Sequence, residues 1–264
     1  MRKFLDQNYS SNHILSKKNK LLEFYYNYKN LKKINFLGYY ENNKLKAVLG
    51  LIFLRNWDPK IDNYLYIALL TKSKKFKQDV FFKFLSFILK KIKPTFLGCV
   101  GYNKVISKIF GKIGHCVYLN HFYITNNSIK KKISKNLKDH KIIKKNNLQM
   151  LVSDKLEKIP KSNFYPKKTK KYFNNKYSNN PYYKYLFLNF NYKNEVKFFF
   201  IIREIKIPTF KTKIFRIVDF YGKIYKSTNI TNEINSFLQK NNAEYIDFLN
   251  YGINKNLLIS MGFK

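Results

Sequence analysis

The sequence contains few cysteines, no long apolar run and no apolar leader, and each absence narrows the class of protein. Two cysteines, Cys99 and Cys116, are too few for a disulfide framework. The N-terminal stretch MRKFLDQNYSSNH lacks the apolar core that a signal peptide contains. No apolar run approaches the roughly 20 residues that span a bilayer. We therefore predict a cytoplasmic protein with reduced thiols.

Arginine and acidic residues are also scarce, which bears on the formal net charge of +37. Only four of the 52 basic residues are arginines, namely Arg2, Arg55, Arg203 and Arg216. Sites that read nucleic acids favour arginine, because its planar guanidinium makes paired contacts with bases. Abundant Lys, Asn, Ile, Phe and Tyr instead indicate an AT-rich coding sequence. Nucleic-acid binding stays an alternative, and the charge predicts non-specific attraction to RNA, phosphates and anionic membranes.

The sequence does contain 45% apolar residues, enough for one large core or two small ones. Alternating and helix-spaced apolar positions predict a first series of elements. These are a hairpin over 35–53 with its turn at 41–44, strands over 64–71, 95–100 and 116–126, and helices over 78–93 and 103–113. We expect Asn103 to cap the last helix and Gly114 to end it in the left-handed conformation.

A second series follows a polar, strongly charged segment over 126–147. We predict a helix and then a strand within 166–188, strands over 196–205 and 213–222, a helix over 231–239 with Thr231 as its candidate N-cap, a strand over 243–252, and a short helix ended by Gly262. Residues 98–114 and 247–262 both contain a strand, an asparagine-lysine pair, a short helix and a glycine. We therefore predict two copies of one α/β unit.

This order, and the stretch GYNKVISKIFGKIGH at 101–115 in particular, resembles the GNAT acyltransferase fold. Two such units in tandem look like the Fem-type double-domain aminoacyltransferases. The segments NHIL, LNHFY, RIVDFYG and AEYIDF look like a related set associated with bacterial surface-polysaccharide biosynthesis. The resemblance implies an α/β (α+β) protein with mixed, mainly antiparallel sheets flanked by helices. It places GNAT-like units at 1–126 and 161–264, with a linker or edge segment at 127–160. On this resemblance, either the second unit lacks its last strand or the sequence is a fragment.

The resemblance further implies acyl-CoA, such as acetyl-CoA, or an aminoacyl-tRNA as the acyl donor. Residues 72–80 take the place of the family's pyrophosphate loop. The expected donor-binding residues are Lys74, Lys75, Lys77, Gln78 and Asn103. The sequence departs from the family in two ways: this loop has no glycine, and Phe110 and Leu258 stand where the family has a proton-donating tyrosine.

Histidines, and the few acids on apolar strands, are the candidates for chemistry. His13 and His121 are candidate bases, because imidazole titrates near neutral pH. Asp219 and Asp247 interrupt apolar strands, where a carboxylate must be paired or used. The alternatives are a structural histidine at 121 and structural pairing of the aspartates with Arg203 or Arg216. Candidate substrate-binding residues are Trp57, Asn120, Glu244, Asn250 and Tyr251. The spacing of His, Cys, Asp and Glu predicts no metal site.

Together these features predict an N-acyltransferase-like protein. It would transfer an acyl or aminoacyl group to an amine of a sugar nucleotide or lipid-linked saccharide in cell-surface glycan biosynthesis. It would be cytoplasmic, with peripheral contact to an anionic membrane as a further option. The main alternative is a non-catalytic GNAT-fold module that binds saccharide or assembles a biosynthetic complex. Nucleic acid would enter only non-specifically or as the tRNA donor.

Overall fold

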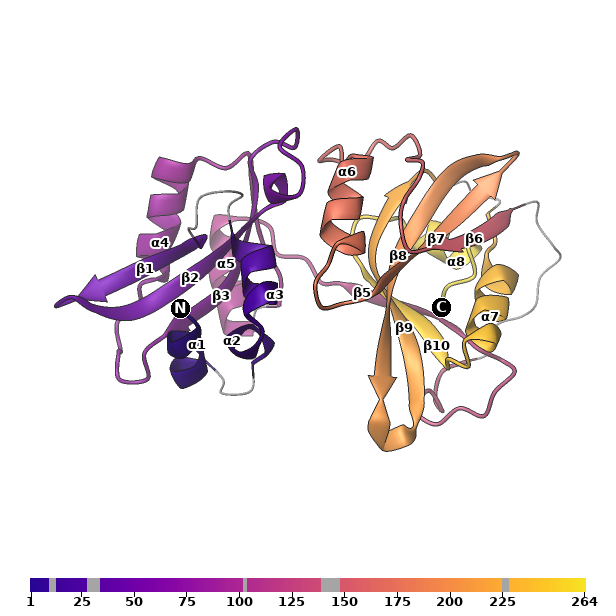
Figure 1. Ribbon diagram of the computed structural model, residues 1–264, viewed down its shortest axis with the longest axis horizontal. Helices are drawn as coiled ribbons and strands as arrows, with labels where there is room; N and C mark the ends of the chain where they lie inside the picture. Colours follow the sequence, from indigo (N-terminus) through magenta and orange to yellow (C-terminus); the bar gives the residue numbers. More distant parts are fainter. Residues whose placement is uncertain (10–12, 28–33, 102–103, 139–147, 225–227) are drawn as a thin grey trace. The chain divides into compact units, whose positions relative to one another are not determined.

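The computed structural model describes residues 1–9, 13–27, 34–101, 104–138, 148–224 and 228–264. The chain divides into two compact units, Met1–Gly114 with Lys171–Tyr182, and His115–Lys170 with Tyr183–Lys264. Figure 1 shows a β-sheet with flanking helices in each unit. The chain is therefore an α/β protein with two mixed, mainly antiparallel sheets, as the sequence predicts.

Four strands form the sheet of the first unit, in the order β1-β2-β3-β4. The strands β1 (Phe36–Glu41), β2 (Lys44–Phe53) and β3 (Tyr64–Lys72) are antiparallel neighbours, and β4 (Phe96–Cys99) runs parallel to β3. Asn42 and Asn43 have φ of 49° and 58°, so the predicted asparagine turn joins β1 to β2. The crossover from β3 to β4 contains α4 (Phe81–Phe87) and a π-helical turn, Ile88–Ile92.

Apolar side chains cover both faces of β2, which explains why most of this strand is buried. One face packs against α4 through a cluster that includes Leu49, Leu51, Phe81, Phe84 and Ile88. On the other face, Tyr26 of α3 (Asn19–Tyr26) lies against Gly50, where an added Cβ would lie 2.6 Å from the tyrosine ring. The helices α1 (Arg2–Asn8) and α2 (Ile14–Lys17) precede α3, and α5 (Lys104–Ile113) follows β4.

Six strands form the sheet of the second unit, in the order β5-β10-β9-β8-β7-β6. Antiparallel pairing joins β6 (Gln149–Ser153), β7 (Tyr185–Tyr192), β8 (Glu195–Ile207) and β9 (Thr212–Gly222). The strand β10 (Tyr245–Asn250) is parallel to β9 and antiparallel to β5 (Asn120–Thr125). The helices of this unit are α7 (Thr231–Lys240), in the crossover from β9 to β10, and α8 (Lys255–Ser260), after β10. The helix α6 (Lys170–Phe173) precedes β7 in the chain, but from Lys171 onward it belongs to the first unit.

The core of the second unit lies between one face of its sheet and the helices α7 and α8. The strands contribute Phe122, Ile124, Phe200, Phe215, Ile246 and Phe248, and the helical segments contribute Ile234, Phe237, Leu238, Leu258 and Met261. Side chains alternate between the faces of a strand, so the residues between these core positions point to the opposite face. That opposite face carries the candidate site described below.

The two sheets share one topology, which agrees with the predicted duplication. In each, an antiparallel meander of three strands, β1-β2-β3 or β7-β8-β9, leads through a helix to a parallel fourth strand, β4 or β10. A further helix, α5 or α8, follows that strand. Residues 98–114 and 247–262 therefore occupy equivalent places in the two units.

The strand β5 lies in the second sheet, whereas the sequence suggested that residues 116–126 would end the first unit. It pairs with β10, and the backbone of Lys264 exchanges two 3.0 Å hydrogen bonds with Tyr123. Phe122 and Ile124 are buried in the second core, which explains this placement. The second sheet thus has a strand beside β10 where none was expected. The segment 127–160, expected as a linker or edge, contributes β6 at the opposite edge.

Two predicted helix ends are wrong. Gly114 donates its N–H to Phe110 over 2.8 Å, as in a continuing helix, and does not adopt positive φ. The helix α7 begins after Ile230, and its Thr231 N–H is bound by the Asn229 side chain at 3.0 Å. The prediction for Gly262 is confirmed, since its φ is 103° at the end of α8. Asn103 lies outside the described residues.

Gly222 ends β9 in a backbone conformation that other residues rarely adopt. Its φ is 120°, and an added Cβ would lie 2.5 Å from both the Lys197 oxygen and the Phe198 Cα. We expect Gly222→Ala to lower the free energy of unfolding by about 2–4 kcal/mol, because the backbone must shift. The midpoint of urea unfolding measures this loss.

The matched control for that variant is Gly111→Ala. Gly111 lies within α5, and no described atom beyond its chain neighbours and its own helix backbone lies within 4 Å of its added Cβ. Alanine there should be neutral or stabilise by up to about 1 kcal/mol, because it favours the helix. Equal urea midpoints for the two variants would contradict the assigned backbone at Gly222.

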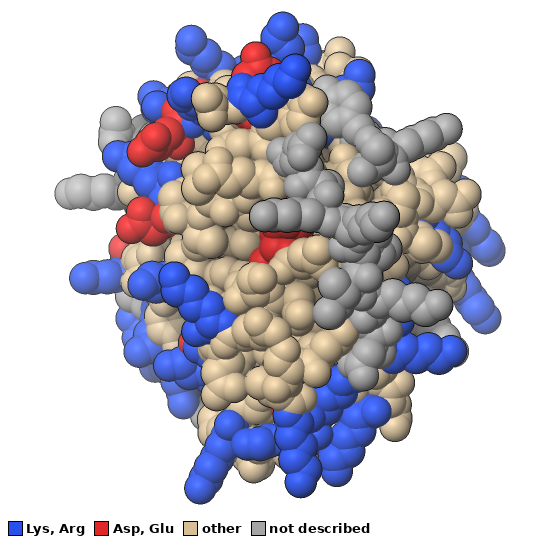
Figure 2. Space-filling view, turned by 90° about the vertical axis from the view of Figure 1, so that its right-hand side faces the viewer, with Lys and Arg blue, Asp and Glu red and all other residues tan. Residues whose placement is uncertain are grey.

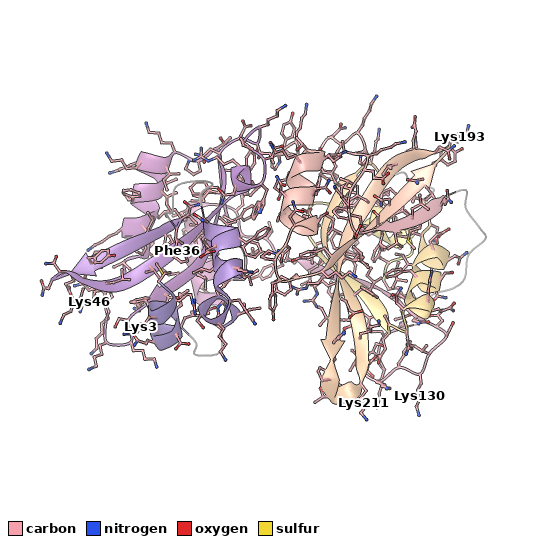
Figure 3. The ribbon with its side chains drawn as sticks, in the orientation of Figure 1. Lys3, Phe36, Lys46, Lys130, Lys193 and Lys211 are labelled. Carbon is pink, nitrogen blue, oxygen red and sulfur yellow. The ribbon has the colours of Figure 1, made fainter. Side chains whose placement is uncertain are left out.

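The many lysines are dispersed over the surface. Figure 3 shows the labelled Lys46, Lys193 and Lys211 at or near the turns of β-hairpins and Lys130 in a loop, with side chains that point outward. On the face seen in Figure 2, blue side chains border a centre that is mostly uncharged. Solvated, mutually separated charges of this kind raise solubility and attract anions weakly.

Candidate functional site

A buried carboxylate lies in the middle of β10. The side chain of Asp247 is 1% exposed. Arg216, its register partner on β9, donates from Nε to Oδ1 over 2.9 Å and from Nη2 to Oδ2 over 2.7 Å. These hydrogen bonds raise the pKa of Arg216. The positive charge of Arg216 compensates the buried carboxylate of Asp247, as burial of a charge requires. Arg216 is one of the two arginines that the sequence offered as partners for the aspartates.

His121 contacts the same carboxylate from the neighbouring strand, β5. Its Nε2 lies 3.4 Å from Asp247 Oδ2, while 48% of its side chain is exposed. A carboxylate at this position favours the tautomer with the proton on Nε2, which leaves Nδ1 able to accept a proton. His121 therefore has the two features of a general base, a partner that orients the ring and access to solvent.

These three side chains share the sheet face opposite the core of α7 and α8. Each of the three residues is preceded or followed in the sequence by a residue of that core. Successive side chains of a strand point to opposite faces, so the three point away from the core. The core neighbours are Phe122, Phe215, Ile217, Ile246 and Phe248. Tyr245 lies two residues before Asp247 and so faces the same way. Burial raises the pKa of the Tyr245 phenol, and the Asp247 carboxylate adds to the rise. This phenol therefore stays protonated near neutral pH and can donate a hydrogen bond.

Asp219 also faces this side, farther along β9. An irregularity in the pairing of β8 with β9 places Asp219, rather than Val218, opposite Ile201. The Lys168 Nζ lies 2.9 Å from both carboxylate oxygens. The structure thus brings Asp219, Asp247 and His121 to one face, and it pairs Asp219 with a lysine that the sequence gave no reason to select.

Glu244 is fully buried and is bound by the backbone of residues 132–134. The N–H groups of Lys132, Ile133 and Ser134 and the Ser134 hydroxyl donate to its carboxylate over 2.9–3.1 Å. Burial alone would raise the pKa of Glu244, but these hydrogen bonds outweigh it and hold the pKa below its ordinary value. Glu244 therefore has a structural role, in which it fixes residues 132–134 of the segment before β6.

Three other predicted substrate-binding residues lie at one end of the β5–β10 pair. Asn120 is exposed and lies opposite Asn250, which is buried and donates to the Ile253 carbonyl over 3.4 Å. Tyr251 follows the strand and is 62% exposed. Leu249, the register partner of His121, is 43% exposed. The imidazole is therefore bordered by an open surface with both apolar and polar groups.

Two predicted site residues lie inside the first unit. Trp57 is 3% exposed and packs against the rings of Phe24, Tyr25 and Tyr172. His13 caps α2, since its Nδ1 accepts the Leu15 N–H over 3.3 Å, and burial lowers its pKa. The geometry of both residues is that of structural groups.

The loop between β3 and α4 holds the remaining donor-binding candidates. Lys74, Lys75, Lys77 and Gln78 are all exposed. The Asp79 carboxylate accepts the Phe81 N–H over 2.9 Å, so it already binds a free amide at the start of α4. The phosphates of an acyl donor would therefore be bound by the lysine ammonium groups of this loop rather than by the N-terminus of α4. Phe110, in the place of the family's tyrosine, packs edge-on against Phe81 with ring centroids 5.2 Å apart.

Neither a membrane span nor a metal centre is found in the described parts of the chain. No helix there is long and apolar enough to cross a membrane. Nor do His, Cys, Asp and Glu side chains gather there in groups of three or more that could hold a metal ion.

Comparison with known proteins relates the fold, not the sequence, to acyltransferases. No protein-family model matches the sequence, and the search of curated proteins found no match. The structure is similar over 98% of its length to a GCN5-related N-acetyltransferase from Anabaena variabilis, with a TM-score of 0.55 and 13% identity, and it spans 64% of that chain.

A second similar structure is the myristoyl-CoA complex of N-myristoyltransferase from Saccharomyces cerevisiae. The TM-score is 0.47 with 12% identity, over 99% of this chain and 72% of that one. At such identities the likeness to the Anabaena protein establishes the fold alone. Two sheets of shared topology and this likeness lead to one conclusion: the chain has the fold of the GCN5-related N-acetyltransferases.

Proposed function

We propose that the protein is an N-acyltransferase whose general base is His121, oriented by Asp247. The observation that carries this proposal is the contact of a half-exposed imidazole with a buried, arginine-paired carboxylate on one face of a GNAT-type sheet. The fold supports the reaction class, because GNAT-type transfer requires positioning and a base rather than a metal or a covalent nucleophile.

The chemistry assigned to the side chains is a proton transfer. An acyl donor supplies an activated carbonyl, and the acceptor amine attacks it, so that a C–N bond forms and the bond to the leaving group breaks. The amine proton passes to Nδ1 of His121. Asp247 stabilises the imidazolium that results, since its Oδ2 lies 3.4 Å from Nε2. Two hydrogen bonds from Arg216 hold that carboxylate in place.

The acceptor we propose is an amine on a sugar nucleotide or a lipid-linked saccharide. The exposed surface around His121, with Leu249 and Tyr251, offers apolar and aromatic contacts of the kind that pack against sugar rings. Asn120, exposed at the start of β5, would add a polar contact. Such an acceptor would place the protein in the synthesis of a cell-surface glycan.

For the donor we propose acyl-CoA, with its phosphates held by Lys74, Lys75 and Lys77. Replacing these three exposed lysines by Gln should weaken binding of acetyl-CoA or a longer acyl-CoA about tenfold or more, because three point charges are lost. Isothermal titration calorimetry at about 150 mM salt measures the change and limits non-specific attraction.

The matched control removes the exposed Lys90, Lys91 and Lys93, from the other end of the same helical segment. This variant loses the same net charge and should bind as the unaltered protein does. Equal weakening in the two variants would contradict a specific donor site in the loop. Absence of any acyl-CoA binding would overturn the CoA donor and favour an aminoacyl-tRNA.

A further inference from the structure

A second arginine lies next to Arg216 and has no acidic partner among the described residues. Arg203 on β8 is half-buried and is the register partner of Arg216 on β9. It also lies opposite Tyr185 on β7. Arg203 and Arg216 therefore project from adjacent strands on the face that carries Asp247 and His121.

The Arg203 guanidinium lies over an aromatic ring. Its central carbon lies 4.5 Å from the ring centroid of Tyr183. This cation–π contact helps to hold the guanidinium in place and uses none of its N–H groups, which can therefore donate to an acceptor. The side chain is thus oriented before any ligand arrives.

Like charges directly opposite each other on a sheet are destabilising. Asp247 compensates Arg216 through Nε and Nη2. Within the described parts of the chain, Arg203 makes no hydrogen bond or ion pair of this kind. Its neighbour Glu204 points to the other face and pairs with Lys213 at 3.1 Å. An anion bound to Arg203 would relieve this repulsion.

The choice of arginine here is also informative. The chain uses lysine for 48 of its 52 basic residues, yet two of its four arginines lie side by side on this face. Arginine differs from lysine in its planar set of donors, which match the paired oxygens of a phosphate. Arg203 and Arg216 therefore place planar sets of N–H donors side by side, as recognition of a phosphate requires.

We infer that Arg203, with the outer edge of the Arg216 guanidinium, binds a phosphate group of the acceptor. The inference rests on the proposed function, because it assigns the class of molecule whose amine reaches His121. Neighbouring strands lie about 4.8 Å apart, so three strand spacings separate the backbones of Arg203 and His121 by roughly 14 Å. An amino sugar that carries a phosphate or diphosphate has a suitable extent.

The test is calorimetric titration with inorganic pyrophosphate at about 150 mM salt. Arg203→Gln should weaken binding about tenfold, and Arg203→Lys should recover only part of it, since the charge returns without the planar donors. The control is Lys206→Gln, on the same strand, where the side chain is 80% exposed and points to the other face. That variant should bind pyrophosphate as the unaltered protein does.

Each outcome decides the inference separately from the proposed function. Equal affinity in Arg203→Gln and the unaltered protein, or full recovery in Arg203→Lys, would overturn the phosphate subsite while leaving transfer by His121 intact. Arg203-dependent binding that persists in His121→Asn supports the subsite even if no transfer is found. Vesicles containing phosphatidic acid form a second arm, in which Arg203-dependent binding would assign the phosphate to a lipid-linked acceptor rather than a soluble one.

Discussion

Replacing His121 by Asn should lower the rate of acyl transfer about 10²–10⁴-fold. Asparagine can still donate to Asp247, so the buried carboxylate keeps its partners, but the side chain can no longer accept the amine proton. Affinity for donor and acceptor should change little, because the imidazole acts on the proton rather than on binding. Steady-state kinetics with an amino-sugar acceptor measure the loss in kcat.

The control for this variant is His115→Asn, since His115 is exposed outside the strands of the second unit. It should retain full activity. Unchanged kcat in His121→Asn would remove the assigned base. Unchanged cellular glycan in Asp219→Asn and Asp247→Asn variants would favour the alternative of a non-catalytic, saccharide-binding or assembly module.

Replacing Glu244 by Gln should lower the free energy of unfolding by about 2–4 kcal/mol. The carboxylate accepts hydrogen bonds from three backbone N–H groups and one hydroxyl at zero exposure. A Gln side chain directs an NH₂ group at some of these donors and leaves them unsatisfied. Urea unfolding measures the shift, and Glu195→Gln, which alters an exposed pair with Lys197, should leave the midpoint unchanged.

The same carboxylate makes stability depend on pH. Its pKa is lower in the folded chain than the ordinary glutamate value of about 4.3. The stabilisation is therefore complete above that ordinary value and is lost as the pH falls through the folded pKa. Between pH 6 and pH 3, Glu244→Gln should lose less stability than the unaltered chain. An identical pH dependence of stability in the variant and the unaltered chain would show that the pKa of Glu244 is the same in the folded and unfolded states.

Local pattern predicted most of the strands and the order in which they occur. The paired asparagines of the first hairpin, the long apolar strands of the second sheet and Gly262 each carry a short-range signal, and each is found where the sequence indicates. The aspartates on apolar strands were equally informative, because a buried carboxylate requires compensation wherever it lies. That argument selected Asp247 and correctly included Arg216 among its partners.

Long-range contacts could not be predicted in this way. Lys168 meets Asp219 across 51 residues, and Glu244 is held by backbone groups more than 100 residues earlier. Backbone donors have no sequence signature, so nothing marked residues 132–134 as the partner of a glutamate. The three N-terminal helices were also missed, because helices as short as α2 carry too few residues to show periodicity.

The placement of β5 has a consequence for how the chain folds. Asp247 and Tyr123 are register partners, so the edge of the second sheet closes only when segments more than 120 residues apart in sequence meet. Such non-local pairing slows folding, because the entropy of closing a large loop is lost before the contacts form. Until β10 is synthesised, Phe122 and Ile124 have no core to enter, and the nascent chain must carry an uncovered apolar strand that invites association with other chains.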